Sequence, residues 1–306
     1  MNRIAVTLSL TVLATLLSPL YAKQYKLYYL GGQSNMDGYG SVNELPELHR
    51  QVVDDVLIYQ SSQEQVNTPT NGAGKWTPLT AGHGRGFTSN GTANTYSDRF
   101  GIEITFAKRL RELDPSTPIA LLKYSKGGTS IHADVAGDFG CWDPDFDQGD
   151  GINQYDHFLA TLRRGLSVGD IDGDGEEDTL VPTGILWMQG ESDATTRETA
   201  EQYEANLKRL MDLVRAALRV DDLPVVVGRI SDSGQDADGK VWDFGDRLRR
   251  AQADFCAKDP RAALVTSTDN YGYSDKWHYD TAGYLDLGVQ FAEAMHRLER
   301  QGPSGQ

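Results

Sequence analysis

Serine, aspartate and histidine side chains that could act together stand near opposite ends of this 306-residue chain. Ser34 follows a short apolar run, two glycines and Gln33, where a strand would leave its hydroxyl exposed at the edge of a sheet. Asp275 precedes His278 by three residues, so its carboxylate can fold back within one turn and accept the Nδ1 proton of the imidazole. The free Nε2 can then take the serine proton. Each residue also has a plain structural explanation, since serine and aspartate commonly cap helices.

The other five histidines are weaker candidates for a base. His49, His157 and His296 lie in polar helical patterns, where a surface role is sufficient. His83 and His132 lie in predicted loops that could line a site. Only His278 has an aspartate placed to orient it.

Hydrogen-bond donors follow two further predicted strands. Gly127 and Gly128 come after the apolar run Ile119 to Tyr124, and either glycine can bring a bare backbone N–H to an oxyanion. Gln189 follows the next strand and offers a side-chain NH₂ group. Together with the N–H of Ser34, these donors would form an oxyanion hole. The same residues are also ordinary turn formers.

Six short apolar runs read as strands, and helical patterns separate them. The predicted strands are Lys26 to Leu30, Val56 to Tyr59, Ile119 to Tyr124, Gly184 to Met188, Leu223 to Ile230 and Ala262 to Thr266. The predicted helices are Ile102 to Leu113, Ala200 to Leu218, Phe244 to Ala257 and Gly283 to Leu298. This alternation predicts an α/β fold, a three-layer α/β/α sandwich around a mainly parallel sheet of five to six strands. Such sheets bind ligands beyond the carboxyl ends of their strands, where the candidate residues stand.

The first 22 residues have the order of a secretory signal peptide, with a positive start, an apolar run and small residues before Lys23. A membrane anchor is the alternative, but the apolar run is shorter than the roughly 20 residues needed to span a bilayer. We therefore expect a secreted or periplasmic protein with no membrane contact after cleavage. Residues 23–300 read as one domain, with long loops at Thr68 to Asn94 and Val135 to Asn153 that could shape a site, and residues 301–306 as a disordered tail.

Charge and cysteine content exclude several classes of function. A net charge of −15 argues against a nucleic-acid partner, because phosphate binding requires clustered Lys and Arg. Cys141 and Cys256 are the only cysteines, and neither has a metal-binding spacing. They could form one disulfide in an oxidising compartment, which the sequence does not decide. Oligomeric state is equally open.

Four ordered blocks resemble the conserved motifs of SGNH hydrolases, and more narrowly carbohydrate esterase family 6 and the sialate O-acetylesterase-like domain. The blocks are Gly-Gln-Ser-Asn-Met at 32–36, Gly-Gly-Thr at 127–129, Trp-Met-Gln-Gly-Glu-Ser-Asp at 187–193 and Asp275-x-x-His278. The resemblance covers most of residues 24–297. It implies a flavodoxin-like SGNH fold and a carbohydrate acetylesterase.

The resemblance also implies roles for individual residues. Ser34 would be the nucleophile, His278 the base and Asp275 the group that orients it. The oxyanion hole would be formed by the N–H groups of Ser34 and of Gly127 or Gly128, and by the amide of Gln189, where many SGNH enzymes have asparagine. Glu191 resembles a constant residue of the carbohydrate-esterase branch and is expected to have a supporting role.

An acidic segment at 170–178 suggests a second site. Asp170, Asp172 and Asp174 alternate before Gly175, and Glu176 and Asp178 follow, as oxygen ligands do in the first half of a calcium loop. The twelfth position of an EF-hand would be Val181 rather than glutamate, so an intact EF-hand is not present. Structural calcium and a solvated acidic turn both remain open.

The expected function is hydrolysis of O-acetyl or other O-acyl esters on carbohydrate, through an acyl-enzyme and without a catalytic cofactor. Trp76, Trp142 and Tyr271 to Tyr273 could stack on sugar rings or pack in the core. One alternative is a carbohydrate-binding protein without turnover. Another is a glycosidase, which would need two carboxylates facing each other across a cleft.

Overall fold

A computed structural model describes residues 22–62, 71–147 and 153–302. Its centre is a seven-stranded sheet with the strand order β11-β10-β9-β1-β8-β3-β4. Six strands run parallel, and β4 pairs antiparallel with β3 at the edge. The strands are β1 (Gln24–Gly32), β3 (Val53–Gln60), β4 (Thr77–Leu79), β8 (Ile119–Ser125), β9 (Thr179–Met188), β10 (Val225–Gly228) and β11 (Ala262–Val265).

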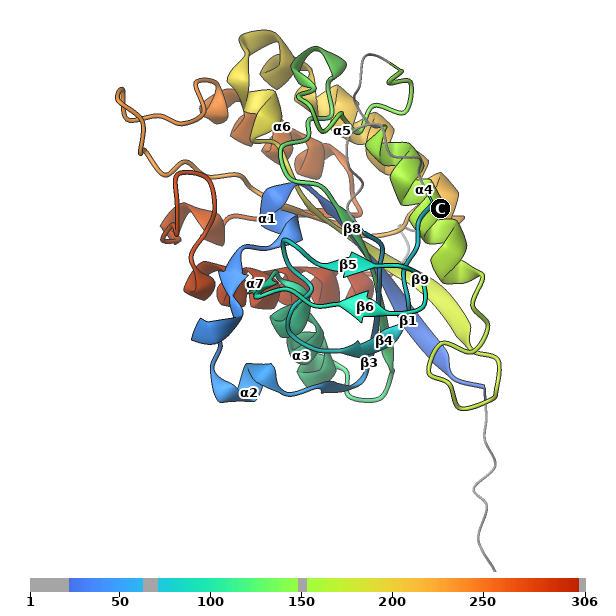
Figure 1. Cartoon of the computed structure of the whole chain (residues 1–306). Helices are drawn as coiled ribbons and strands as arrows, with labels where there is room; N and C mark the ends of the chain where they lie inside the picture. The colour runs from blue at the N-terminus through green and yellow to red at the C-terminus, as the bar shows by residue number, and fades with distance from the viewer. Residues whose placement is uncertain (1–21, 63–70, 148–152, 303–306) are drawn as a thin grey trace, which may run out of the picture.

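Helices cover both faces of this sheet, which makes three layers (Figure 1). On one face, α3 (Glu103–Leu113) packs against α7 (Thr281–Arg300). On the other lie α4 (Gln154–Leu166), α5 (Arg197–Leu218) and α6 (Gly245–Lys258), and α5 contacts α6. The predicted α/β sandwich is confirmed. The sheet has one strand more than expected because β4 has only three residues, one of them a proline, which leaves no apolar period to detect.

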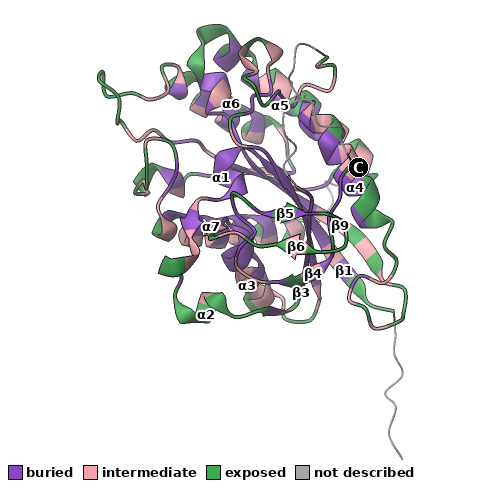
Figure 2. Cartoon of the chain, in the orientation of Figure 1, coloured by how far each residue is buried: buried purple, intermediate pink, exposed green. Residues whose placement is uncertain are grey.

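The central strand β1 is buried on both faces, as the purple strands in Figure 2 show. Successive side chains of a strand point to opposite faces. Tyr28 accordingly meets Phe106 of α3, and Tyr29 meets Phe158 of α4. This burial fixes the register of β1 and therefore the place where the chain leaves the sheet at Ser34.

Shorter elements lie outside the main sheet. The helix α1 (Ser34–Asp37) follows β1 directly, and α2 (Glu47–Arg50) lies further along the chain. Two small antiparallel pairs join β2 (Gly40–Ser41) to β7 (Arg99–Phe100) and β5 (Thr88–Ser89) to β6 (Asn94–Thr95). Single 3₁₀ turns occur at Val42–Glu44, Ala133–Val135, Ser192–Thr195 and Ser267–Asn270.

Several predictions concern the ends of the chain. The predicted signal peptide lies outside the described residues except for Ala22. Most of the predicted disordered tail does too, but Gln301 and Gly302 are described and close the end of α7 by bonding back to Leu298 and Glu299. No helix within the described ranges is long and apolar enough to cross a membrane.

Candidate active site

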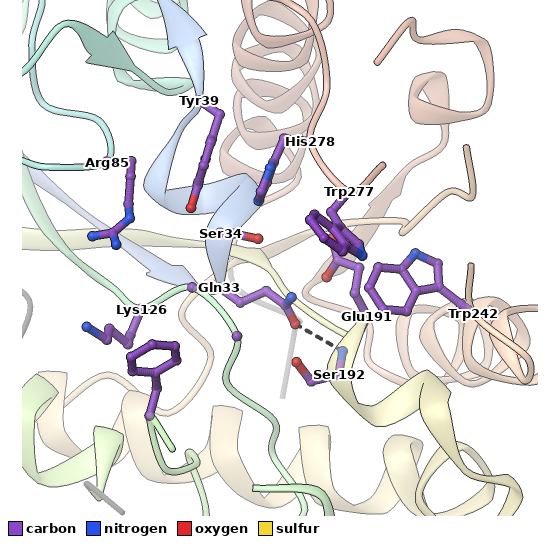
Figure 3. A pocket seen from close by; sticks show the side chains of 13 residues that line it. Gln33, Ser34, Tyr39, Arg85, Lys126, Glu191, Ser192, Trp242, Trp277 and His278 are labelled. Atoms are coloured by element: carbon purple, nitrogen blue, oxygen red, sulfur yellow. Dashed lines mark hydrogen bonds between the residues drawn. The ribbon is translucent and has the colours of Figure 1, made fainter. Parts of the chain in front are cut away.

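The residues predicted to be catalytic meet at the carboxyl edge of the sheet. There Ser34 and His278 line a pocket of about 430 Å³ (Figure 3), and Asp275 contacts His278. Ser34 comes from the end of β1, Gly127 and Gly128 from the loop after β8, and His278 from the segment before α7. The lining residues are Gln33, Ser34, Tyr39, Arg85, Lys126, Gly127, Gly128, Phe139, Glu191, Ser192, Trp242, Trp277 and His278.

Asp275 and His278 are joined by a hydrogen bond of 2.7 Å between Oδ2 and Nδ1. The other carboxylate oxygen of Asp275 accepts the backbone N–H groups of Trp277 and His278, so a tight turn holds the pair together. Burial alone would raise the pKa of Asp275, but these hydrogen bonds together lower it. Asp275 is thus an anion whose position favours the His278 tautomer with a proton on Nδ1 and an open Nε2.

His278 is 8% exposed, and its imidazole faces the pocket above Ser34 (Figure 3). Burial lowers its pKa, Asp275 raises it, and the positive charges of Arg85 and Arg99 lower it further. The net direction is downward from the usual value. The neutral imidazole, the form that can accept a proton, is therefore favoured at neutral pH.

Close packing between β1 and β9 positions Ser34. Gly32 has a φ of +141°, and a Cβ there would lie 2.0 Å from the carbonyl oxygen of Met188, so only glycine fits. The N–H of Gln33 then bonds that same carbonyl, and α1 begins at Ser34. Ser34 is 8% exposed and opens onto the pocket.

Gly127 lies directly beside Ser34. A Cβ on Gly127 would stand 3.2 Å from the Cβ of Ser34, whereas one on Gly128 would meet the ring of Phe139. The N–H of Lys126 is bonded to the carbonyl of Gly32, which ties this loop to the end of β1. Of the two glycines left open by the sequence, Gly127 is the one next to the serine.

Gln189 is placed differently from the expected oxyanion donor. Its side chain is fully buried behind the pocket, and its NH₂ group donates to Asp193, to the carbonyl of Thr129 and to Gln33 at 2.7–3.2 Å. Two amide hydrogens shared among these acceptors leave none for the pocket. In this structure Gln189 supports the site from behind and does not line it.

Gln33 lines the pocket instead, and sequence reasoning did not single it out. Its Oε1 accepts the N–H groups of Gly190 and Ser192 as well as the amide of Gln189. These three donors hold the amide oxygen of Gln33 in place. The Nε2 of Gln33 is thereby left on the side of Ser34. The position of Gln33 inside the Gly-Gln-Ser-Asn-Met block was the available signal.

Glu191 lines the pocket but is 2% exposed. Its Oε1 accepts a 2.8 Å hydrogen bond from Asn35, whose amide also donates to the carbonyl of Trp277. Burial raises the pKa of Glu191, and its Oε2 has no partner among the described residues. Through Asn35, Glu191 connects the helix that begins at Ser34 with the turn that carries His278.

Two walls of different character complete the pocket. Arg85 and Lys126 stand on one side, and Trp242 and Trp277 stand on the other (Figure 3). Trp277 is 48% exposed and therefore presents much of its ring to solvent. Arg85 comes from the first of the two long loops predicted to shape a site. These wall residues had no sequence signal of their own, because each comes from a different loop.

Other candidates from the sequence lie elsewhere. His83 is fully buried with its Nδ1 on Gln60, and burial lowers its pKa to about 3, while His132 contacts Gln202 at the surface. Trp76 and Trp142 are buried in the core, so they are not sugar platforms. Both cysteines are free thiols in this structure, Cys141 buried and Cys256 partly buried.

The acidic segment brings Asp170, Asp172 and Asp174 together, with one oxygen of each within 4.8 Å of the others. Glu176 and Asp178 are not part of this group, and the Oδ2 of Asp178 accepts the N–H of Ile171. Lys23, which sequence reasoning did not connect with the loop, bonds Asp172 and also Asp174, the latter at 3.0 Å. A cation and the Lys23 amine would therefore use the same carboxylates. Calcium binding stays a prediction.

An aspartate–histidine pair, a serine just after a strand and a neighbouring glycine thus lie together at the carboxyl edge of the sheet. A family profile described as carbohydrate esterase, sialic acid-specific acetylesterase, matches residues 24–297. The chain therefore belongs to this family and is a carbohydrate acetylesterase that acts on acetylated carbohydrate. A probable carbohydrate esterase of Arabidopsis thaliana is 25% identical over 280 residues, covering 90% of this chain and 92% of the relative.

Solved structures support the fold. A protein from Arabidopsis thaliana superposes with a TM-score of 0.60 at 21% identity, covering 90% of this chain and 99% of that one. A carbohydrate acetylesterase from Xanthomonas citri gives a TM-score of 0.63 at 18% identity, covering 90% of this chain and 56% of its own. The structure of NanS gives 0.60 at 14% identity, covering 92% and 99%.

Proposed function

We propose that this carbohydrate acetylesterase is an exported serine esterase in which Ser34 is the nucleophile, His278 the base and Asp275 its orienting carboxylate. The observation that carries the proposal is the 2.7 Å Asp275–His278 hydrogen bond in a turn that places His278 in one pocket with Ser34. Export rests on the signal-like residues 1–22 alone.

In the first half of the reaction, the Oγ of Ser34 attacks the acetyl carbonyl carbon while its proton passes to the Nε2 of His278. The tetrahedral intermediate collapses, and His278 returns the proton to the sugar oxygen as that C–O bond breaks. Water then attacks the acetyl-serine ester with His278 again as base. Acetate leaves and Ser34 regains its proton.

The oxyanion is assigned to the N–H groups of Ser34 and Gly127 and to the Nε2 of Gln33. Neither backbone N–H is donated to another group within the described part of the chain. The Gln33 amide is oriented by three donors to its oxygen. Preorganised donors of this kind stabilise the transition state because they need no rearrangement during reaction.

The pocket walls favour a sugar that carries a negative group. Arg85 and Lys126 place positive charge on one side, in a chain whose net charge is −15. Trp277 and Trp242 offer ring faces for the apolar face of a sugar on the other side. This arrangement is compatible with an acetylated sugar acid, the substrate type in the family's description.

Glycosidase activity is the less favoured function. Glu191 is the single carboxylate among the described residues that line the pocket. Hydrolysis of a glycosidic bond needs two such groups at opposite faces of the ring. Binding without turnover is disfavoured by the presence of nucleophile, base and orienting carboxylate together.

The test compares the wild type with Ser34→Ala, His278→Ala and Asp275→Asn on acetylated sialic acid, acetylated xylan and a small aryl acetate. We expect acetate release by the wild type and a fall in kcat of roughly 10³-fold or more in each variant. Thermal unfolding checks that each variant is folded. Near-normal turnover by folded Ser34→Ala, or new reducing ends in place of acetate, would reject the proposal.

A further inference from the structure

The aromatic ring of Tyr39 lies flat against the imidazole of His278. The ring centroids are 3.5 Å apart and the planes differ by 5° (Figure 3). Tyr39 belongs to the short connection between α1 and β2, so it comes from the segment that directly follows Ser34. One face of the imidazole is thus covered by a residue close to Ser34 in the chain.

Tyr39 is itself held in place. Its backbone carbonyl accepts a 3.0 Å hydrogen bond from Arg99, and the preceding Gly38 donates its N–H to the carbonyl of Ser34. Arg85 hydrogen-bonds the Tyr39 side chain. The ring therefore has a fixed position relative to Ser34, and any rotation of His278 out of its plane would collide with it.

We propose that Tyr39 is a positioning residue, whose ring holds the imidazole of His278 in line with Ser34. This inference rests on the proposed function. Asp275 fixes the ring at Nδ1 only, which leaves rotation about that hydrogen bond unrestrained. A stacked ring removes that freedom, because the imidazole cannot tilt without a clash.

The stack also affects how His278 titrates. The charged groups that act on His278 are Asp275 from its own turn, Arg85 from the long loop and Arg99 from β7. Burial is the largest influence that lowers its pKa, and Tyr39 covers one ring face. Removing the ring admits water to that face, so the pKa of His278 should rise.

The experiment measures kcat, KM and the pH profile of aryl acetate hydrolysis for Tyr39→Leu, Tyr39→Met and Tyr39→Phe. We expect kcat to fall about tenfold in the Leu and Met variants, with a smaller change in KM. The acidic midpoint of the pH profile should move upward in both. Tyr39→Phe keeps the ring and should restore both kcat and midpoint to near the wild-type values.

Phe139→Leu is the matched control, because it removes another aromatic ring of the pocket without touching His278. Its pH midpoint should stay in place. A folded Tyr39→Leu or Tyr39→Met with wild-type kcat and midpoint overturns the inference, and so does a Tyr39→Phe as impaired as they are. Failure of the wild type to release acetate would instead reject the proposed function, so the two failures are distinguishable.

Discussion

At the scale of single residues, the protonation of His278 controls when the pocket can act. Burial and two arginines push its pKa down, while Asp275 pushes it up. The balance is downward, which keeps the imidazole neutral into mildly acidic solution. Only this neutral form can accept the proton of Ser34.

We expect kcat/KM to rise with pH through a single ionisation whose midpoint lies below the ordinary histidine value of roughly 6.5. The sign follows because the active form is the deprotonated one and its pKa is lowered. Initial rates between pH 4 and 9 in buffers of constant ionic strength measure this midpoint. A midpoint clearly above 7 would mean that Asp275 outweighs the burial of the imidazole.

The sequence predicted Ser34, Asp275 and His278 as a group, and the structure brings Ser34 and His278 to one pocket with Asp275 bonded to His278. A spacing of three residues suffices to predict the Asp275–His278 contact, because a single turn spans it. The contact of Tyr39 with His278 joins residues far apart in the chain, so no local sequence pattern predicts it. Gln189 was expected to donate to the oxyanion, but its NH₂ group points away from the pocket because Asp193 and Thr129 offer buried acceptors.

At the scale of elements, the central strands place the donors and the nucleophile side by side. β1 pairs with both β8 and β9, so the loops after these three strands converge. Gly127 stands in the loop after β8 at the point nearest Ser34. The distance between these two loops is therefore a sensitive part of the site.

We expect Gly127→Ala to lower kcat by about tenfold, since displacements of about 1 Å at a reacting group can cost 100-fold. The new Cβ would lie 3.2 Å from the Cβ of Ser34, which forces a shift of a few tenths of an ångström. Gly137→Ala serves as control, because its Cβ would meet only an oxygen at 4.0 Å. Equal kcat for both variants would show that the loop after β8 shifts to accept the new Cβ without displacing Ser34.

Six of the seven strands were predictable because each is an apolar run bounded by turns. Among the strands and helices of the three layers, two elements were not predicted. β4 is too short for a pattern, and Pro78 argues against a strand. α4 was read only as a polar helix-like stretch, although Phe158 and Leu162 form its buried stripe and Asn153 caps it. Gln154, His157 and Thr161 share the buried face of this helix, so its apolar stripe is short.

At the scale of the whole molecule, positive and negative charges are unevenly distributed. The net charge is −15, yet the pocket wall carries Arg85 and Lys126. The acidic segment 170–178 lies at the opposite end of β9, and it is partly neutralised by Lys23. Tyr25 of β1 also donates to Asp172 at 2.9 Å, which ties the segment to the sheet.

If the acidic segment binds calcium, millimolar calcium should raise the melting temperature of the wild type relative to EDTA, because a ligand of the native state stabilises it by mass action. Lys23→Gln removes the competing amine, so its calcium-dependent shift should be larger. Asp172→Ala/Asp174→Ala should abolish the shift in both backgrounds. If calcium changes the melting temperature of neither the wild type nor Lys23→Gln, the calcium site is rejected and the segment is a solvated acidic turn.

The proposed nucleophile begins the helix that follows the first strand, and the proposed base lies in the turn before the last helix. During synthesis, Ser34 is therefore made early and His278 late. Every incomplete chain that ends between these two positions contains Ser34 but lacks His278. The Asn35 bond to the carbonyl of Trp277 closes the site only when the C-terminal turn has folded back. A prematurely terminated chain that ends before Asp275 lacks His278, and it also lacks α7, whose buried face packs against α3.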